Sequence, residues 1–367
     1  MNLEHKTQLF TPTPPAPAPI AATGVIHWLR KNLFSSWTNS ILTICCLALL
    51  AKCIPPLLSW ALIDAVWSGD PAMCTNDSGA CWAFIGAKYR ILLVGTYPPE
   101  LLWRPIASAL LFAGVIAATV SGCCKKRHLF AAWPLLLIVI LWFIGGGAGL
   151  KEVDQSMWGG LMLSLGLAAV GILLSIPFGI LLALGRQSKM VGISTPCIGF
   201  IELIRGVPLI TILFMASVMM PLFLPEDLQI NNLLRVQIGI ILFSSAYIAE
   251  VVRGGLQAVS TGQTDAAKAL GLSSWMVTLF IVLPQALRHV LPALIGRCIA
   301  LFKDTSLVII VGLLDFLGMA KAASQDQIWL GHDAEGYAFC AIVYWCICFG
   351  MSRYGRSLEK RGPKKNN

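Results

Sequence analysis

The chain has 367 residues, of which 57% are hydrophobic and only 12% are charged, and its mean hydropathy is +0.75. Soluble domains carry about 25% charged residues, so this composition excludes a soluble globular domain and predicts several membrane spans. The formal charge of +9 does not by itself indicate a nucleic-acid partner, because cations also gather at the cytoplasmic edge of a bilayer.

Residues 1–38 are predicted to form a cytoplasmic N-terminal tail. The segment is polar and contains the proline-rich run Pro12–Pro19, which favours an extended, polyproline-like chain. We expect no cleavable signal peptide, because a charged and polar stretch stands where the apolar region of such a peptide would lie.

The apolar runs of the chain predict an all-α polytopic membrane protein of about eight helices, since a span needs about 20 apolar residues. Three helices fall within residues 39–150, and five fall within residues 151–352. A basic cytoplasmic tail, residues 353–367, follows the last span. The predicted spans are Ile41–Leu62, Ile106–Cys124, Leu129–Leu150, Trp158–Gly185, Gly199–Leu224, Val236–Glu250, Val290–Leu314 and Gly336–Ser352.

The basic residues predict the orientation of these spans. With the N-terminus inside, 17 Lys and Arg lie in inside segments, 6 lie outside and 4 lie within spans, which accounts for all 27. Cytoplasmic loops carry the excess of Lys and Arg in membrane proteins. Both termini are therefore predicted to be cytoplasmic, and residues 63–105 to form a large periplasmic loop.

The twelve cysteines show no zinc-ligand spacing, and no metal site is predicted. Most of them lie in or beside apolar runs, where cysteine is a common small filler. Cys74 and Cys81 differ, because they lie in the polar loop 63–105. An oxidising periplasm would permit a disulfide between them, although their spacing does not establish one.

The apolar run Leu129–Leu150 contains Gly145-Gly146-Gly147. We interpret these glycines as sites of close helix packing within the span. A phosphate-binding loop is disfavoured, because no Gly-Lys-Ser/Thr sequence follows them.

The cytoplasmic segment 253–289 predicts two short helices with a corner between them. Thr264 is a candidate cap for the first helix, with Asp265 in its first turn, and Gly271 is placed to end it. Ser273 or Ser274 can start the second helix, and Pro284 is expected to interrupt or kink the chain. Such a small-sided element can dock into a groove on a partner, or it can be an ordinary amphipathic helix at the membrane surface.

This segment resembles the signature loop of bacterial ABC-importer permeases. The matching residues are Asp265-Ala266-Ala267, Gly271 and Ile281-Val282-Leu283-Pro284, although the family usually has Glu where this chain has Asp265. Three further stretches look like motifs of polar amino-acid permeases: Glu202 to Pro208, Ala246 to Gly255 and Lys303 to Leu307. The three N-terminal spans are similar to those of the longer permeases of general L-amino-acid systems.

The resemblance implies a type I ABC-importer permease core of five helices, preceded by three extra helices. It implies that two separate ATPase subunits, which hold ATP and Mg²⁺, dock on residues 253–289, so that this chain is not an enzyme and carries no cofactor. It also implies a periplasmic amino-acid-binding protein, a location in the bacterial inner membrane and L-amino acids as cargo. The extra helices favour a heterodimer with a related permease over a homodimer. The ATPase-coupling residues would be Asp265, Ala266, Ala267, Gly271, Leu283 and Pro284.

Charged residues within spans are costly, about 2.5–3.5 kcal/mol at the bilayer centre, and usually mark a pathway. Our candidates for the substrate path are Asp304, Lys303, Ser306 and Arg297, where Arg297 and Asp304 lie on nearly one helix face. Family members often carry Asn near position 296, where this chain has Gly296-Arg297. Snorkelling at a membrane edge is the alternative for these residues.

A second group of charged residues lies in the fifth and sixth predicted spans. Glu202 and Arg205 are three residues apart and are predicted to pair on one helix face. We favour a structural or gating role for this group over contact with substrate. Its members are Glu202, Arg205, Glu250 and Arg253.

Two other functional classes fit the sequence less well. An ion-coupled secondary transporter of small polar solutes would need broken helices, often in inverted repeats, and no convincing repeat is visible. A membrane enzyme is disfavoured, because the five histidines show no metal spacing and no Cys–His or paired-carboxylate set. No Walker-type sequence is present, so we expect ATP hydrolysis on another chain.

Overall fold

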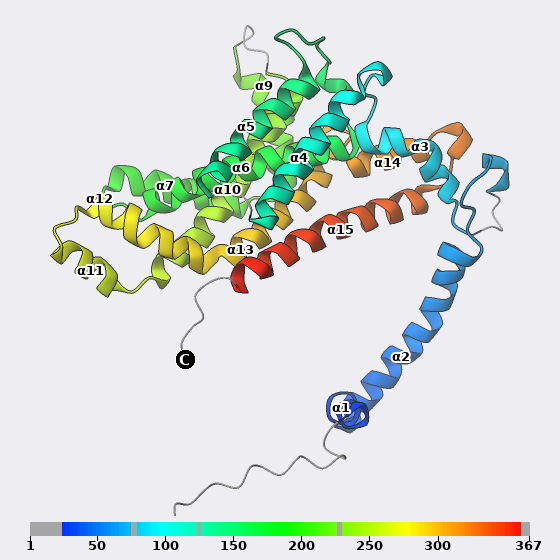
Figure 1. Cartoon of the computed structure of the whole chain (residues 1–367), viewed down its shortest axis with the longest axis horizontal. Coiled ribbons are helices and arrows are strands. Elements are labelled where there is room, and N and C mark those ends of the chain that lie inside the picture. The colour runs from blue at the N-terminus through cyan, green and yellow to red at the C-terminus, as the bar shows by residue number, and fades with distance from the viewer. Residues whose placement is uncertain (1–23, 75–78, 123–125, 226–229, 361–367) are drawn as a thin grey trace, which may run out of the picture. The chain divides into compact units, whose positions relative to one another are not determined.

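The computed structural model describes residues 24–74, 79–122, 126–225 and 230–360. Its elements in these ranges are helices, and isolated strand-like bridges such as Gly147–Leu150 and Gly160–Asp315 occur between them. The predicted all-α class is confirmed (Figure 1). The chain divides into two compact units, residues 1–67 with 72–80, and residues 68–71 with 81–367. The proline-rich run and residues 361–367 lie outside the described part of the chain.

The first unit consists of α1 (Val25–Asn32), α2 (Trp37–Leu58) and a π-helical turn, Ser59–Ile63. Ser36 caps α2 by accepting a hydrogen bond from the Asn39 amide at 3.2 Å. Pro55 and Pro56 lie inside α2 and cannot donate to the helical ladder, which accounts for the widened turn directly after them. The unit closes where the amide of Ala80 donates to the carbonyl of Trp60 at 2.7 Å.

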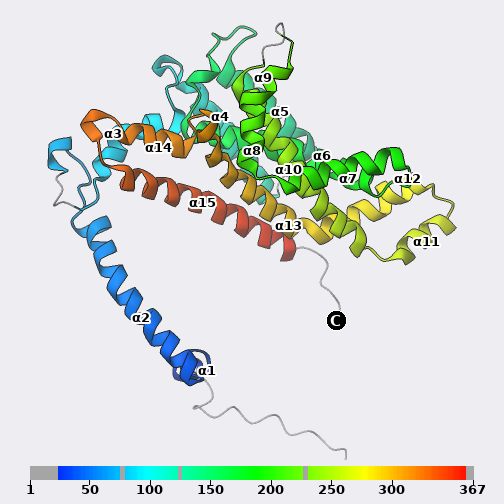
Figure 2. The same ribbon diagram turned by 180° about the vertical axis from the view of Figure 1, so that it is seen from behind.

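The second unit is a bundle in which α10 packs along both α6 and α13 (Figure 2). The helices α11 and α12 form a short excursion between α10 and α13, and a π-helical turn, Val277–Val282, joins α12 to α13. The helices of this unit are α3 (Trp82–Val94), α4 (Trp103–Ser121), α5 (Lys126–Gly145), α6 (Gly160–Arg186), α7 (Val191–Gly206), α8 (Leu209–Phe214), α9 (Met220–Phe223), α10 (Asn232–Ala258), α11 (Thr261–Ala269), α12 (Ser274–Met276), α13 (Leu283–Asp304), α14 (Phe316–Ser324) and α15 (Asp333–Lys360).

Five helical segments among the described residues are long and apolar enough to cross a membrane: Trp37–Ile63, Pro99–Ser121, Gly160–Arg186, Asn232–Ala258 and Asp333–Glu359. A bent helix pair would make a sixth. The predicted count of eight is therefore not confirmed. The predicted seventh span differs most, because α13 already begins at Leu283 and ends at Asp304, after which a 3₁₀ segment, Thr305–Val311, continues the chain.

The predicted fifth span, Gly199–Leu224, is not one straight helix. The helix axis turns by 106° between α7 and the following segment, Leu209–Phe223. Pro208 explains the break, because a proline lacks the amide donor and forces the residue before it out of the helical region; Val207 has φ −113° and ψ 135°.

The predicted third span is also shorter than expected, and its glycines have another role. The apolar part of α5 covers only Ala131–Gly145. Gly146 and Gly147 adopt φ values of +82° and +86°, so they end the helix rather than pack it against a neighbour. The glycine interpretation from the sequence is wrong at these two positions.

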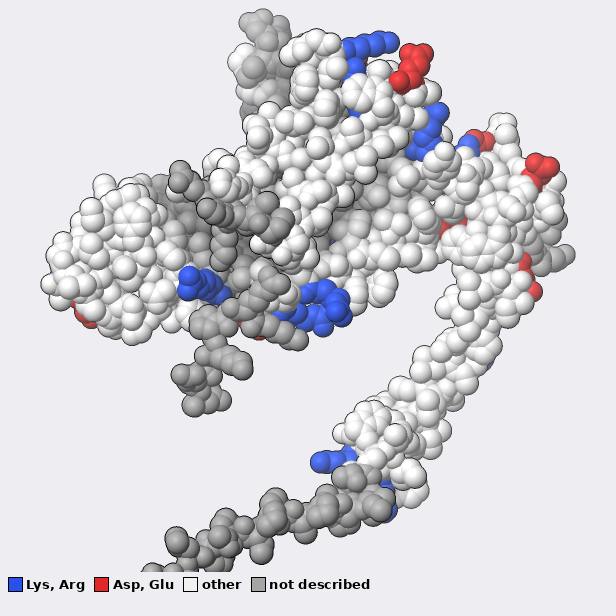
Figure 3. Space-filling model, viewed as in Figure 1, with Lys and Arg blue, Asp and Glu red and all other residues white. Residues whose placement is uncertain are grey.

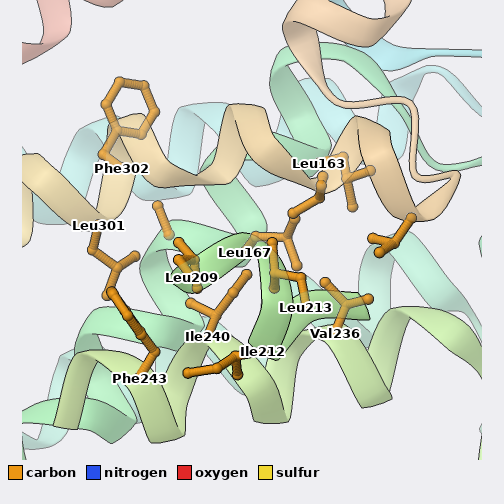
Figure 4. Close-up of a cluster of buried hydrophobic side chains, with 13 residues drawn as sticks. Leu163, Leu167, Leu209, Ile212, Leu213, Val236, Ile240, Phe243, Leu301 and Phe302 are labelled. Carbon is orange, nitrogen blue, oxygen red and sulfur yellow. The ribbon is translucent and has the colours of Figure 1, made fainter. Parts of the chain in front are cut away.

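The core of the second unit lies where α6, α8, α10 and α13 meet. Side chains from the four helices converge there, as Figure 4 shows for Leu167, Leu213, Ile240 and Leu301. Lipid is as apolar as leucine, so close packing rather than escape from water must hold such a core together. Gly179 shows how close the helices come, because a Cβ atom there would lie 2.5 Å from Cγ2 of Ile248 on α10.

Part of the predicted periplasmic loop 63–105 is a packed helix. α3 buries Ala83, Phe84, Ile85 and Leu92, and it packs against α6, α14 and α15. Lys88 on α3 pairs with Asp326 at 2.5 Å and holds the pKa of that carboxyl below its usual value. The prediction of a large loop over residues 63–105 missed this helix.

The cysteines of this region are consistent with the predicted pairing. Cys74 and Cys81 are both disulfide-bonded. The described cysteines that are free all lie elsewhere in the chain: Cys45, Cys46, Cys53, Cys197, Cys298, Cys340, Cys346 and Cys348.

Candidate functional site

The segment between α10 and α13 folds as two short helices joined by a tight corner, and we call residues 260–283 the hairpin. Ser260 caps α11 by accepting a hydrogen bond from the Gly262 amide at 3.3 Å. The predicted cap, Thr264, lies inside α11, and Asp265 therefore lies beyond the first turn. The helix begins earlier than expected because Ser260 is itself a good cap at the end of α10.

The corner of the hairpin follows the prediction. Gly271 has φ +80°, and its amide donates to the carbonyl of Lys268 at 2.9 Å. Only glycine adopts this left-handed conformation without strain, which ends α11 sharply. Ser273 then caps α12 and accepts from the Met276 amide at 3.5 Å. Pro284 does not break the chain as predicted, because it lies in the first turn of α13, where no amide donor is needed.

The hairpin exposes apolar side chains at its tip. Leu270 is 83% exposed, and Trp275 and Phe280 are each 65% exposed. Asp265 and Ala266 are also exposed, whereas Ala267 is buried toward the π-helical turn that α11 packs against. The hairpin thus presents a small, partly apolar surface with one carboxylate.

The base of the hairpin is joined firmly to the bundle. Leu283 and Ala286 of α13 belong to a buried cluster with Leu256 of α10 and Ala183 of α6. The backbones of α10 and α13 come so close at Gly255 that a Cβ atom there would lie 2.7 Å from the Ala286 carbonyl oxygen. A displacement of the hairpin must therefore be transmitted to both helices.

A network of charged residues ties α6, α7 and α10 together near the same end of the bundle. Glu250 is its centre: its carboxylate lies 3.3 Å from Nη1 of Arg186 and 3.3 Å from Nη1 of Arg205, and it also pairs with Arg253. Glu202 binds Nη1 of Arg186 at 2.9 Å instead of the predicted partner Arg205. Glu202 and Arg205 do not pair with each other, because the Arg205 side chain points toward α10 and binds Glu250 there.

The predicted substrate-path residues lie at the end of α13 and just after it. Arg297 stacks over the ring of Tyr247 on α10, with 4.3 Å between the guanidinium carbon and the ring centroid. Among the described residues Arg297 has no carboxylate within ion-pair distance, and its Nε atom is buried without a hydrogen-bond partner. Lys303 is exposed, Asp304 ends the helix, and the Ser306 hydroxyl donates to the carbonyl of Lys303 at 2.8 Å.

Sequence reasoning missed Arg186 and Tyr247. Arg186 is not among the candidates from the sequence, yet it bridges Glu202 and Glu250. Tyr247 lies between two cations, because Arg205 also stacks over its ring at 5.7 Å. Its place three residues before Glu250, one helical turn away, was the signal that could have found it.

Comparison with known proteins places these residues in a family. The sequence profile of the binding-protein-dependent transport system inner membrane component matches residues 175–362, which include the hairpin, the charged network and α13. This chain belongs to that family. It is therefore a permease subunit of an ABC importer, and the expected type I importer permease class is confirmed.

Relatives within this permease family also cover the N-terminal helices. The inner membrane amino-acid ABC transporter permease protein YhdY of Escherichia coli K12 is 47% identical over 358 residues, which is 97% of this chain and 98% of that one. The glutamate/glutamine/aspartate/asparagine transport system permease protein BztC of Rhodobacter capsulatus is 35% identical over 95% of this chain and 96% of its own length. A crystal structure of an amino acid ABC transporter with histidines aligns at 28% identity with a TM-score of 0.49, covering 55% of this permease and 92% of that chain.

Proposed function

We propose that this permease carries L-amino acids across the bacterial inner membrane, and that separate ATPase subunits drive it by docking on the hairpin. The relatives YhdY and BztC, which match nearly the whole chain, are an amino-acid permease and a glutamate/glutamine/aspartate/asparagine permease. Two ATPase subunits, each holding ATP and Mg²⁺, would bind the hairpin on the cytoplasmic side. Both termini are then cytoplasmic, as the distribution of basic residues predicts.

The observation that carries this proposal is the exposed hairpin on a rigid base. Leu270 and Trp275 present apolar surface that water disfavours, and Asp265 adds a charge that can orient a partner. The close approach at Gly255 couples this surface to α10 and α13. Nucleotide binding by docked partners would move the hairpin, and with it the helices that line the path.

Two further partners complete the proposed transporter. A periplasmic amino-acid-binding protein would deliver substrate to the outer face, as the family description, binding-protein-dependent transport, suggests. A related permease would form the second half of the membrane pathway, and we favour a heterodimer because of the additional N-terminal helices.

Within the path we propose that α13 meets the charged groups of the substrate. Arg297 and Lys303 would face carboxylates, and Asp304 would face the α-ammonium. Arg297 supports this most directly, because a partly buried guanidinium with no carboxylate partner among the described residues is costly unless a ligand supplies one. Ser306 is placed one turn away, with its hydroxyl held by the Lys303 carbonyl.

The proposal is tested with Asp265→Lys and Gly271→Ala. Asp265→Lys reverses the charge on the docking surface, and an alanine at φ +80° strains the corner by about 1–2 kcal/mol. We expect normal membrane insertion, loss of co-purifying ATPase and loss of amino-acid uptake in both variants.

Gly262→Ala is the matched control, because a Cβ atom there meets only the Ser260 hydroxyl, at 3.5 Å. Uptake and ATPase stimulation at wild-type levels in Asp265→Lys and Gly271→Ala would show that the hairpin is not the docking site. Uptake by the purified chain alone, driven by an ion gradient, would favour a secondary transporter.

A further inference from the structure

A large cavity lies away from the hairpin, where α5 meets α6 and the start of α10. Its volume is about 1150 Å³, and we call it the outer cavity. Its apolar part comes from Ile144 of α5 and from Met162 and Leu167 of α6. Its polar part comes from the segment 152–158 and from Asn231 and Asn232 at the start of α10. A cavity of this size holds a small ligand together with water.

Hydrogen bonds hold the polar wall of the outer cavity in place. The hydroxyl of Tyr97, which is fully buried, donates to the Ile144 carbonyl at 2.9 Å, and burial raises its pKa, so it keeps that proton. Arg104 is 2% exposed and donates from Nη1 to the Lys151 carbonyl at 2.7 Å. The Val153 amide donates to the Gly145 carbonyl at 3.0 Å. These contacts fix the segment that carries the polar groups of the wall.

Two polar atoms of this wall lack partners among the described residues. They are Nε1 of Trp158, a donor, and Oε1 of Gln155, an acceptor, and both are shielded from water. Unpaired buried polar atoms cost about 1–3 kcal/mol each. Turned toward the cavity, each of these atoms would find a partner in a ligand that both donates and accepts hydrogen bonds.

The charge of the lining selects among possible ligands. The lining has two carboxylates, Glu152 and Asp154, and no Lys or Arg among the described residues. A lipid phosphate would be repelled there. The Asp154 carboxylate accepts from the Ser156 amide at 2.8 Å. The Ser156 side chain, and then this amide, keep the pKa of Asp154 below its usual value, so it is ionised at neutral pH.

A carboxylate ligand group would find neutral donors in the same wall. The side-chain oxygen of Asn231 is engaged by the Leu234 amide at 2.8 Å, which leaves its Nδ2 group as the donor. Trp158 supplies the second donor. The ionised Asp154 and these two neutral donors complement an α-ammonium and an α-carboxylate.

We propose that the outer cavity is a binding site for the zwitterionic backbone of a free amino acid, with Asp154 holding the α-ammonium, and Asn231 and Trp158 the α-carboxylate. This inference rests on the proposed function. It adds a second binding site, at the outer end of the path, that recognises the α-ammonium and α-carboxylate groups common to all amino acids. The site is built partly from α5 and the segment 145–158, which precede the matched family region 175–362.

The test uses the transporter purified with its co-purifying subunits, without binding protein, in the variant Ser156→Cys. Ser156 is exposed and lines the cavity. A membrane-impermeant thiosulfonate labels the new cysteine, and mass spectrometry of the peptide reports the extent. We expect L-glutamine to protect the cysteine, and glutaramate, which is glutamine without the α-ammonium, to protect it poorly.

Adding Asp154→Asn should raise the glutamine concentration for half-protection at least about tenfold, because a charge-assisted hydrogen bond is lost while the amide oxygen can still accept from Ser156. Glu100→Gln is the matched control, since it removes an exposed carboxylate that does not line the cavity, and it should leave the half-point unchanged.

Three results would overturn the inference. The first is a new cysteine that is never labelled, which would mean that a partner subunit or lipid fills the cavity. The second is labelling that glutamine leaves unchanged, and the third is a glutamine concentration for half-protection that Asp154→Asn leaves unchanged. ATP-driven uptake that persists in any of these cases leaves the proposed function intact. Absence of uptake in the wild-type transporter would instead contradict the proposed function itself.

Discussion

Replacing Gly255 by alanine should separate α10 from α13 and weaken coupling. A Cβ atom at this position would lie 2.7 Å from the Ala286 carbonyl oxygen and 2.7 Å from Cγ1 of Val290. Ordinary contacts begin at 3.4 Å, so the two helices must move apart by about 0.7 Å or distort. Overpacking of this kind costs about 1–3 kcal/mol, and a backbone carbonyl cannot rotate away as a flexible side chain does.

The adjacent residue provides the control. A Cβ atom on Gly254 meets nothing within 4 Å, and the position is exposed on the same helix. Both substitutions gain the helix-propensity advantage of alanine over glycine, about 1 kcal/mol, so this gain cancels when the two variants are compared. Gly255→Ala should therefore be less stable than Gly254→Ala by about 1–3 kcal/mol.

The assay is thermal unfolding of the purified transporter in detergent, combined with uptake and ATP hydrolysis in proteoliposomes. Gly255→Ala should transport less amino acid per ATP hydrolysed, whereas Gly254→Ala should match or exceed the wild type. Equal stability and equal coupling in the two variants would refute the close approach of α10 and α13 as the link between the hairpin and the bundle.

Three further predictions follow from the charged groups. Glu250→Gln should destabilise the protein by about 2 kcal/mol in thermal unfolding, because three guanidinium groups lose a shared partner that is mostly buried. Glu202→Gln should cost less than about 1 kcal/mol, because the Glu202 side chain is 55% exposed and binds one arginine; equal losses in the two variants would argue against Glu250 as the centre of the network. Arg297→Gln should lower uptake of glutamate relative to glutamine by about tenfold, measured as the ratio of kcat/KM values, and an unchanged ratio would remove Arg297 from the substrate path. Lys88 lowers the pKa of Asp326, so the contribution of this ion pair to stability is present above the unfolded pKa of 3.8 and is lost as pH falls through the lower folded pKa. The Tm difference between wild type and Asp326→Asn should therefore be constant from about pH 5 to 7 and shrink below about pH 4. A change near pH 6 would implicate another group.

Local signals in the sequence were sufficient for several features. Gly271 ends α11, and Ser273 starts the next helix, because both effects depend on the conformation and hydrogen bonding of a few neighbouring residues. The predicted ATPase-coupling motif also coincides with the hairpin and the residue after it, because the motif consists of residues that are close together in the sequence. The predictions failed where two good local signals competed, as when Ser260 rather than Thr264 capped α11.

Contacts between distant segments could not be read in this way. Glu202 and Arg205 have ideal spacing for a pair on one helix, yet each binds a residue from another helix, Arg186 in one case and Glu250 in the other. Periodicity describes which residues share a face, but it does not identify the groups that the face meets. The helix α3 was missed because its apolar residues number too few for a span and its packing partners α6, α14 and α15 are all distant in the sequence.

The sequence by itself determined that the chain lies in a membrane and is all helical, and it located the hairpin, because apolar runs, basic loops and short motifs act on their own neighbourhood. Only the tertiary structure decided how α7 turns away from α8, which cations surround Glu250 and Tyr247, and where the outer cavity lies. The physical reason is that charge pairing and cavities depend on which helices become neighbours, and that choice is made by packing over the whole bundle.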